Sequence, residues 1–125
     1  MNRSEAIACA ARQKGASGLS RSSSHFANVN SAKDVWWIEI PEAKLSQAGD
    51  LNINLLLYDS RSRILHHLQV PKAYLKEHEK QLATRPEKTC IVLELSAEKA
   101  RLFRDVRSRG HGLEFGKFLS ATIPI

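Results

Sequence analysis

Hydrophobic and polar residues alternate along several short segments of the chain, which is the pattern of half-buried β-strands. In residues 35–40 (VWWIEI), Trp36 shares one face with two isoleucines, and Trp37 shares the other face with Glu39. The alternation predicts that Trp36 lies in the core. Trp37 lies on the mixed face, where it is either covered by a neighbouring element or available as a platform for a base or a protein partner.

Two further alternating segments, residues 51–58 and 64–70, flank a polar turn at residues 59–63 (DSRSR). This arrangement predicts a β-hairpin. Residues 89–95 are almost continuously apolar, which is typical of a central strand. Residues 120–125 are expected to form a closing edge strand.

Apolar residues at helical spacing predict two helices in the second half of the chain. The first covers residues 71–82, with Pro71 as its first residue and Tyr74 and Leu82 on its apolar stripe. The second covers residues 97–109 and is expected to bury one face. Its opposite face would present guanidinium groups to the solvent, from Arg101, Arg104 and Arg107.

The order of the predicted elements is β-β-β-α-β-α-β, which indicates an α+β fold. We expect residues 34–125 to form one small domain with a mostly antiparallel sheet and helices packed on one face. Residues 1–33 are rich in Ser and Ala and are expected to form a flexible, partly disordered basic arm before this domain. Within the arm, residues 5–14 predict a marginal short helix with Ser4 as its N-cap.

Charge changes this picture because the positive residues gather at the two ends of the chain. The 125 residues carry a net charge of +6. Residues 1–33 hold five Lys/Arg and one acid, residues 34–98 hold eight and ten, and residues 99–125 hold six and two. A slightly acidic body with two basic ends indicates a polyanionic partner. The composition of residues 1–33 also matches an organelle transit peptide, although we favour the flexible arm.

Phosphate contacts are therefore predicted for basic residues of the hairpin turn, the C-terminal region and the arm. Arginine outnumbers lysine at both ends of the chain, which suits bidentate contacts with phosphate. The alternative is that surface arginines pair with nearby acids such as Glu98 and Asp105. The expected partner is DNA or RNA, bound without base-specific readout. The candidate residues are Arg61, Arg63, Arg101, Arg104, Arg107, Arg109, Lys117, Arg21 and Lys14.

A protein–protein interaction module, such as an inhibitor, an adaptor or a subunit, is a second interpretation of the same charges. An acidic surface on a partner protein would attract the basic ends equally well. Aromatic residues would then anchor the interface. The candidates for such anchors are Trp37, Tyr74 and Phe115.

A metal-dependent nuclease is the third interpretation. The two hairpin strands and the following helix resemble the unit of the ββα-metal nucleases, in which a general-base His closes the first strand and a metal-binding His lies on the helix. Here His66 and His67 lie midway along the second strand and point to opposite faces, so they cannot both line one site. His78 falls in the predicted helix. The sequence therefore departs from the nuclease pattern at the position of the general base, the end of the first hairpin strand.

Other cofactor chemistry has little support in the sequence. Cys9 and Cys90 are the two cysteines, and no pair of residues has the spacing of a zinc site, so we expect no metal or other cofactor. We expect a reducing, cytoplasmic location and no disulfide. No apolar run approaches the roughly 18 residues of a membrane span. The sequence therefore favours a non-catalytic nucleic-acid-binding accessory module.

Overall fold

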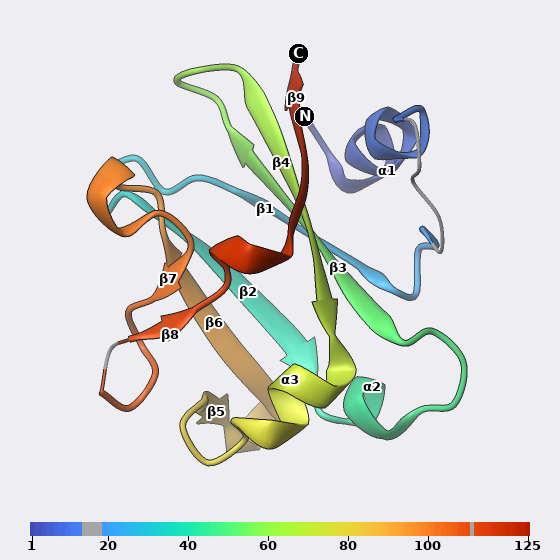
Figure 1. Ribbon diagram of the computed structural model, residues 1–125, viewed down its shortest axis with the longest axis vertical. Helices are drawn as coiled ribbons and strands as arrows, with labels where there is room; N and C mark the ends of the chain where they lie inside the picture. The colour runs from blue at the N-terminus through green and yellow to red at the C-terminus, as the bar shows by residue number, and fades with distance from the viewer. Residues whose placement is uncertain (14–18, 111) are drawn as a thin grey trace.

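The computed structural model describes residues 1–13, 19–110 and 112–125 of the chain (Figure 1). Over these residues, nine strands form two mostly antiparallel sheets, accompanied by a few short helices. The α+β class expected from the sequence is confirmed. The expected strand order in a single sheet is not confirmed, because the strands divide between two sheets.

The first sheet has the strand order β1-β3-β4-β9. β3 and β4 form the predicted hairpin, and β9 pairs with β4 as the expected closing edge strand. β1 pairs with β3 in the parallel sense. The bounds of these strands are Ser24–Asn28 (β1), Asn52–Asp59 (β3), Ile64–Pro71 (β4) and Leu119–Pro124 (β9).

The second sheet has the strand order β2-β6-β7-β8, and β5 pairs with the other half of β6. β2 and β6 form its long antiparallel pair and correspond to the strands predicted at residues 35–40 and 89–95. The remaining strands are only two or three residues long. The bounds are Val35–Pro41 (β2), Ala83–Arg85 (β5), Cys90–Ser96 (β6), Arg104–Asp105 (β7) and Leu113–Glu114 (β8).

The main hydrophobic core lies between the two sheets and takes its side chains chiefly from β2, β3, β4 and β6. Trp36 is fully buried there, and its indole N–H donates to the carbonyl oxygen of Tyr58 at 3.0 Å. The Trp37 side chain points away from this core and is 39% exposed. The alternation along β2 therefore assigned both tryptophans to the correct faces.

Helix α1 (Arg3–Ala11) packs on the outer face of the first sheet (Figure 1). Its Ala6 and Ala10 are fully buried in a second, smaller cluster, which also contains Leu56, Leu65 and Ile123. The helix begins after Asn2, whose side chain forms a capping box with Glu5, instead of after the predicted Ser4.

The prediction of a flexible arm that ends at residue 33 is not confirmed, because both α1 and β1 lie within the folded body. Strand β1 (SHFAN) is short and polar, so alternation does not distinguish it from a linker. Its partner β3 lies far along the chain, and a parallel pairing leaves no hairpin signal. Residues 14–18 of the predicted arm lie outside the described residues.

The helix predicted over residues 97–109 is wrong. The segment contains a short 3₁₀ helix, Lys99–Arg101, followed by the strand β7. Phe103 has a left-handed backbone, with φ of 65°, which interrupts any α-helix at that point. Its side chain enters the core and stacks on Trp36, with 5.7 Å between the ring centroids. Burial of this ring in a turn explains why the apolar spacing resembled that of a helix.

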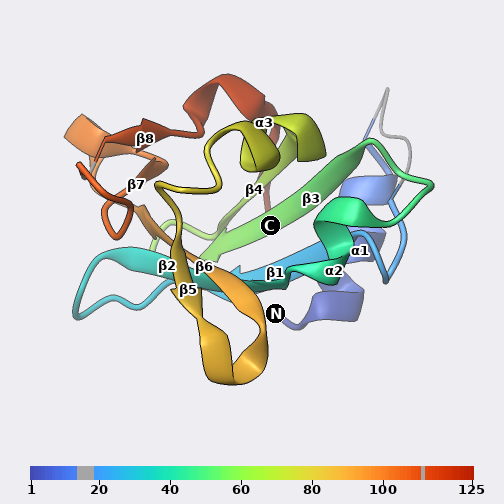
Figure 2. The same cartoon turned by 90° about the horizontal axis from the view of Figure 1, so that it is seen from below.

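The helix predicted over residues 71–82 is present but shorter. α3 covers Lys72–Glu77, with Pro71 as its N-cap, and Leu82 of the predicted stripe is buried beyond the helix end. α3 lies next to α2 (Ala43–Ser46) at one end of the sheets (Figure 2). Two further 3₁₀ helices occur, at Pro86–Lys88 and Gly116–Phe118. None of the helices in the described parts of the chain is long and apolar enough to cross a membrane.

Candidate functional site

Four of the arginines predicted to contact phosphate are paired with carboxylates of the same chain. Such pairing was the alternative to phosphate binding, and it lowers the free positive charge of the hairpin turn and the C-terminal region. Exposed pairs of this kind contribute little to stability, so a phosphate could still compete for them. The pairs are Arg61 with Asp34 (2.7 Å) and Asp59 (3.0 Å), Arg101 with Glu98 (2.6 Å), Arg104 with Glu114 (2.7 Å) and Arg107 with Glu94 (3.3 Å).

The other predicted phosphate contacts do not gather in one place. Arg63 and Arg109 are exposed and form no ion pair within residues 1–13, 19–110 and 112–125. The ammonium group of Lys117 lies over the Tyr74 ring, 4.7 Å from its centroid. Lys14 lies outside the described residues. The arginines of the C-terminal region therefore do not form the single helical surface that was predicted. Arg21 lies in a different part of the molecule, described below.

The three aromatic residues predicted to anchor a protein partner differ in their exposure to solvent. Phe115 is fully buried, so it is a core residue with no surface for a partner in this structure. Tyr74 is half-buried against Phe115, and its hydroxyl donates to the carbonyl oxygen of Glu114 at 2.7 Å. Trp37 alone of the three is exposed, and it contacts Arg107.

The structure does not bring the three histidines of the β3–β4–α3 unit together. His66 packs against Trp36 and Phe103, at 5.6 and 5.1 Å between ring centroids. His67 is buried and hydrogen-bonded to Asn54 at 2.9 Å, and His78 contacts Tyr74. Across the described residues, no group of three or more His, Cys, Asp and Glu side chains is placed to hold a metal ion.

A basic hollow of about 560 Å³ lies where α1, β1, β2 and α2 meet. The hollow is shallow and largely open to solvent. Its three cations form no ion pair with any carboxylate in the described parts of the chain. Positive charge is therefore concentrated on a concave surface. The residues that define this basic hollow are Arg3, Arg21, Ser22, His25, Glu39, Pro41 and Lys44.

Backbone groups hold Arg3 in position at the hollow. The Nη2 of Arg3 donates to the carbonyl oxygens of both Arg21 and Ser24. Arg21 in turn donates from Nη1 to the Ser4 hydroxyl at 3.2 Å. These bonds fasten α1 to the segment that leads into β1. They fix two cations relative to each other without neutralising their charge, because none of the acceptors is ionised.

The environment of the hollow lowers the pKa of His25. Burial, together with the positive charges of Arg3 and Lys44, lowers the pKa of His25 from 6.5 to about 4. His25 is therefore neutral at pH 7. Its Nε2 is buried and has no hydrogen-bond partner among the described residues.

Glu39 is the one acid among the described lining residues, and two cations outside the hollow already bind it. Arg85 donates to Glu39 at 2.6 Å and Lys88 lies 3.4 Å from the same carboxylate. The hydrogen bond from Arg85 is the main reason that the pKa of Glu39 is lowered. The carboxylate of Glu39 therefore does little to offset the three cations of the basic hollow.

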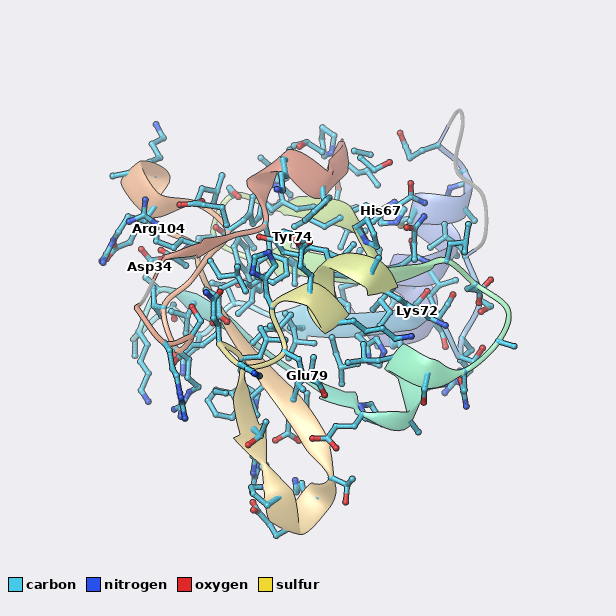
Figure 3. All side chains as sticks on the ribbon, turned by 60° about the horizontal axis from the view of Figure 1, so that its bottom comes forward. Asp34, His67, Lys72, Tyr74, Glu79 and Arg104 are labelled. Atoms are coloured by element: carbon cyan, nitrogen blue, oxygen red, sulfur yellow. The ribbon has the colours of Figure 1, made fainter. Side chains whose placement is uncertain are left out.

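Two smaller hollows, each of about 200 Å³, adjoin the basic hollow and extend it in both directions. The first shares Arg3, His25 and Glu39 with it and ends at Trp37. The second shares Ser22 and Lys44 with it and is also lined by Lys72. Figure 3 shows Lys72 on the opposite side of the view from Arg104, one of the arginines of the C-terminal region. The three adjoining hollows are together called the depression; Trp37 lines the hollow on one side of the basic hollow and Lys72 lines the hollow on the other.

Sequence reasoning found Arg21 but missed Lys44, Lys72 and His25 as site residues. No local pattern marks them, because the depression is assembled from segments that are far apart in the chain. Comparisons of the chain with protein-family models, curated proteins and solved structures found no match. What the depression binds is therefore inferred from the chemistry of the residues that line it.

Proposed function

We propose that this chain is a non-catalytic module that binds nucleic acid through the basic hollow. One observation supports this proposal above the others: Arg3, Arg21 and Lys44 line one concave surface and have no carboxylate partner in the described structure. Concave positive surfaces attract polyanions and raise their rate of association.

The types of cation suit phosphate in particular. A guanidinium group presents a planar set of donors that matches two phosphate oxygens, and a lysine adds a point charge. Because backbone carbonyls already hold Arg3, little side-chain entropy is lost when a phosphate binds there. Lys72, at the far end of the depression, would contact a phosphate further along the strand.

The proposal is tested by fluorescence anisotropy with labelled single-stranded and double-stranded DNA and RNA, titrated across salt. The variant Arg21→Gln/Lys44→Gln removes two charges from the hollow and leaves the Arg3 bonds to the backbone intact. We expect its affinity at low salt to fall at least tenfold. The slope of log K against log salt should become shallower by about 0.7 to 0.9 for each phosphate that the variant no longer neutralises.

The matched control is Arg101→Gln/Arg104→Gln, which removes the same charge from arginines that are paired with Glu98 and Glu114. We expect this control to bind almost as well as the wild type. If the control weakens binding more than the hollow variant does, the site lies in the C-terminal region instead. If the wild type binds no nucleic acid at low salt, the proposal is wrong and an acidic protein becomes the expected partner.

A further inference from the structure

We infer that the nucleic acid in the basic hollow is a single strand with one base stacked against Trp37, an inference that rests on the proposed function. Trp37 projects from β2 on the face away from the core and is 39% exposed. It lines the smaller hollow that shares Arg3, His25 and Glu39 with the basic hollow. A strand whose phosphates contact the cations would therefore pass next to this ring.

The orientation of Trp37 is fixed by its neighbours. The guanidinium of Arg107 lies over the indole, 4.6 Å from the ring centroid. Arg107 is itself held by Glu94, at 3.3 Å, and by a hydrogen bond from its backbone N–H to Asp105. A ring that is already ordered loses little entropy when a base stacks against it. Because Arg107 covers one face of the indole, the base would stack on the opposite face.

A duplex could use the cations but not the tryptophan. In a duplex the faces of the bases are covered by their neighbours, whereas a single strand can turn a base out of its stack. Every base has a π-face, so such a site tolerates any sequence. The combination of a basic depression and one exposed aromatic ring therefore fits a single strand better than a duplex.

Intrinsic fluorescence tests the inference directly, because the chain has two tryptophans and Trp36 is fully buried. Oligothymidylate should quench the wild-type emission, and Trp37→Phe should abolish the quenching. Trp37→Leu should weaken the binding of oligothymidylate about tenfold, the effect typical of losing one base–aromatic stack. The salt slope should stay unchanged, because the cations of the hollow still neutralise the same phosphates.

A strand in which the bases are replaced by abasic residues is the second probe, and it needs no variant. The wild type should bind it as weakly as Trp37→Leu binds oligothymidylate, and Trp37→Leu should lose nothing further. Phe118→Leu, which removes another ring that lies close to a cation, is the control and should leave the affinity unchanged.

The outcomes separate this inference from the proposed function. Equal binding of abasic and normal strands, or a preference for a duplex without quenching, would overturn the single-strand inference while leaving the proposed function intact. The absence of binding to every nucleic acid would overturn both.

Discussion

Asp105 is a buried carboxylate that organises the backbone of two segments. Its Oδ1 accepts hydrogen bonds from the backbone N–H groups of Glu94 and Arg107, each at 3.1 Å. Its Oδ2 has no partner among the described residues. Burial raises the pKa of Asp105 because the charged form loses its hydration. The side chain therefore stabilises the turn through one oxygen, while its charge is unfavourable in this position.

Substitution of Asp105 separates these two effects. Asp105→Ala should lower the free energy of unfolding by about 2–3 kcal/mol, because two backbone donors lose their acceptor. Asp105→Asn keeps an acceptor oxygen without the charge, and it should stay within about 1 kcal/mol of the wild type at pH 7. Urea-induced unfolding measures both values. Equal losses in the two variants would show that the charge, and not the acceptor oxygen, stabilises the turn.

Residues of β2 and of the Asp105 turn show which side-chain positions could be predicted from the sequence. Trp36 and Trp37 were placed on the correct faces because a strand has a fixed period of two. The helical backbone predicted at Phe103 was wrong, because no spacing rule predicts its left-handed conformation. Asp105 competes with helix formation by binding the nearby backbone, and this effect overrode the helical spacing of its apolar neighbours.

At the scale of elements, α1 is stabilised by packing and not by its own length. It has nine residues, which is too short for a stable isolated helix. Ala6 and Ala10 contribute small side chains that let the helix lie close to the sheet. Because Arg3 at its first turn reaches the backbone of the next segment, the packing of α1 also positions one cation of the basic hollow.

A charge at Ala10 should therefore be far more costly than one at Ala8, which is exposed on the same helix. We expect Ala10→Glu to lower the free energy of unfolding by about 2–4 kcal/mol, through steric overlap and burial of a carboxylate. Ala8→Glu should change it by less than about 0.5 kcal/mol. Urea unfolding of the two variants makes the comparison. Similar values for both would mean that α1 does not contribute to the cooperative fold.

The sequence predicted elements well where partners are close in the chain and poorly where they are distant. The β3–β4 hairpin was found because its turn and alternation are local signals. β1 was missed because its pairing with β3 is parallel and distant. The basic hollow was only partly predicted for the same reason: Arg21 belonged to a basic segment, but nothing local connects it with Lys44.

For the whole molecule, buried histidines make stability depend on pH. Burial lowers the pKa values of His25, His66 and His67, that of His25 to about 4. Histidines in the unfolded chain take up protons near pH 6.5, before those in the folded chain do. Their stabilising contribution is therefore complete above about pH 6.5 and is lost as the pH falls towards 4. Asp105, with its raised pKa, acts in the opposite direction, because its buried charge is removed as the pH falls.

The carboxyls of Glu39, Asp59 and Glu87 also have lowered pKa values and add to the loss near pH 4, so we expect the free energy of unfolding to decrease between about pH 6.5 and pH 4. His25→Gln should flatten this decrease by an amount on the order of 3 kcal/mol, the value that corresponds to the lowered pKa of His25. Urea unfolding at several pH values gives both curves. Parallel curves for the variant and the wild type would contradict the assignment of this pH dependence to His25.

The parallel pairing of β1 with β3 also has a consequence for the time at which the site forms. The β3–β4 hairpin closes through a short turn, whereas the pairing of β1 with β3 closes a longer loop and is expected to form more slowly, although β3 is synthesised before β4. β9, the last strand of the same sheet, contributes Ile123 to the cluster on which α1 rests. The basic hollow needs both α1 and β1 in place. The newly made chain should therefore complete its binding surface only after β9 has been synthesised.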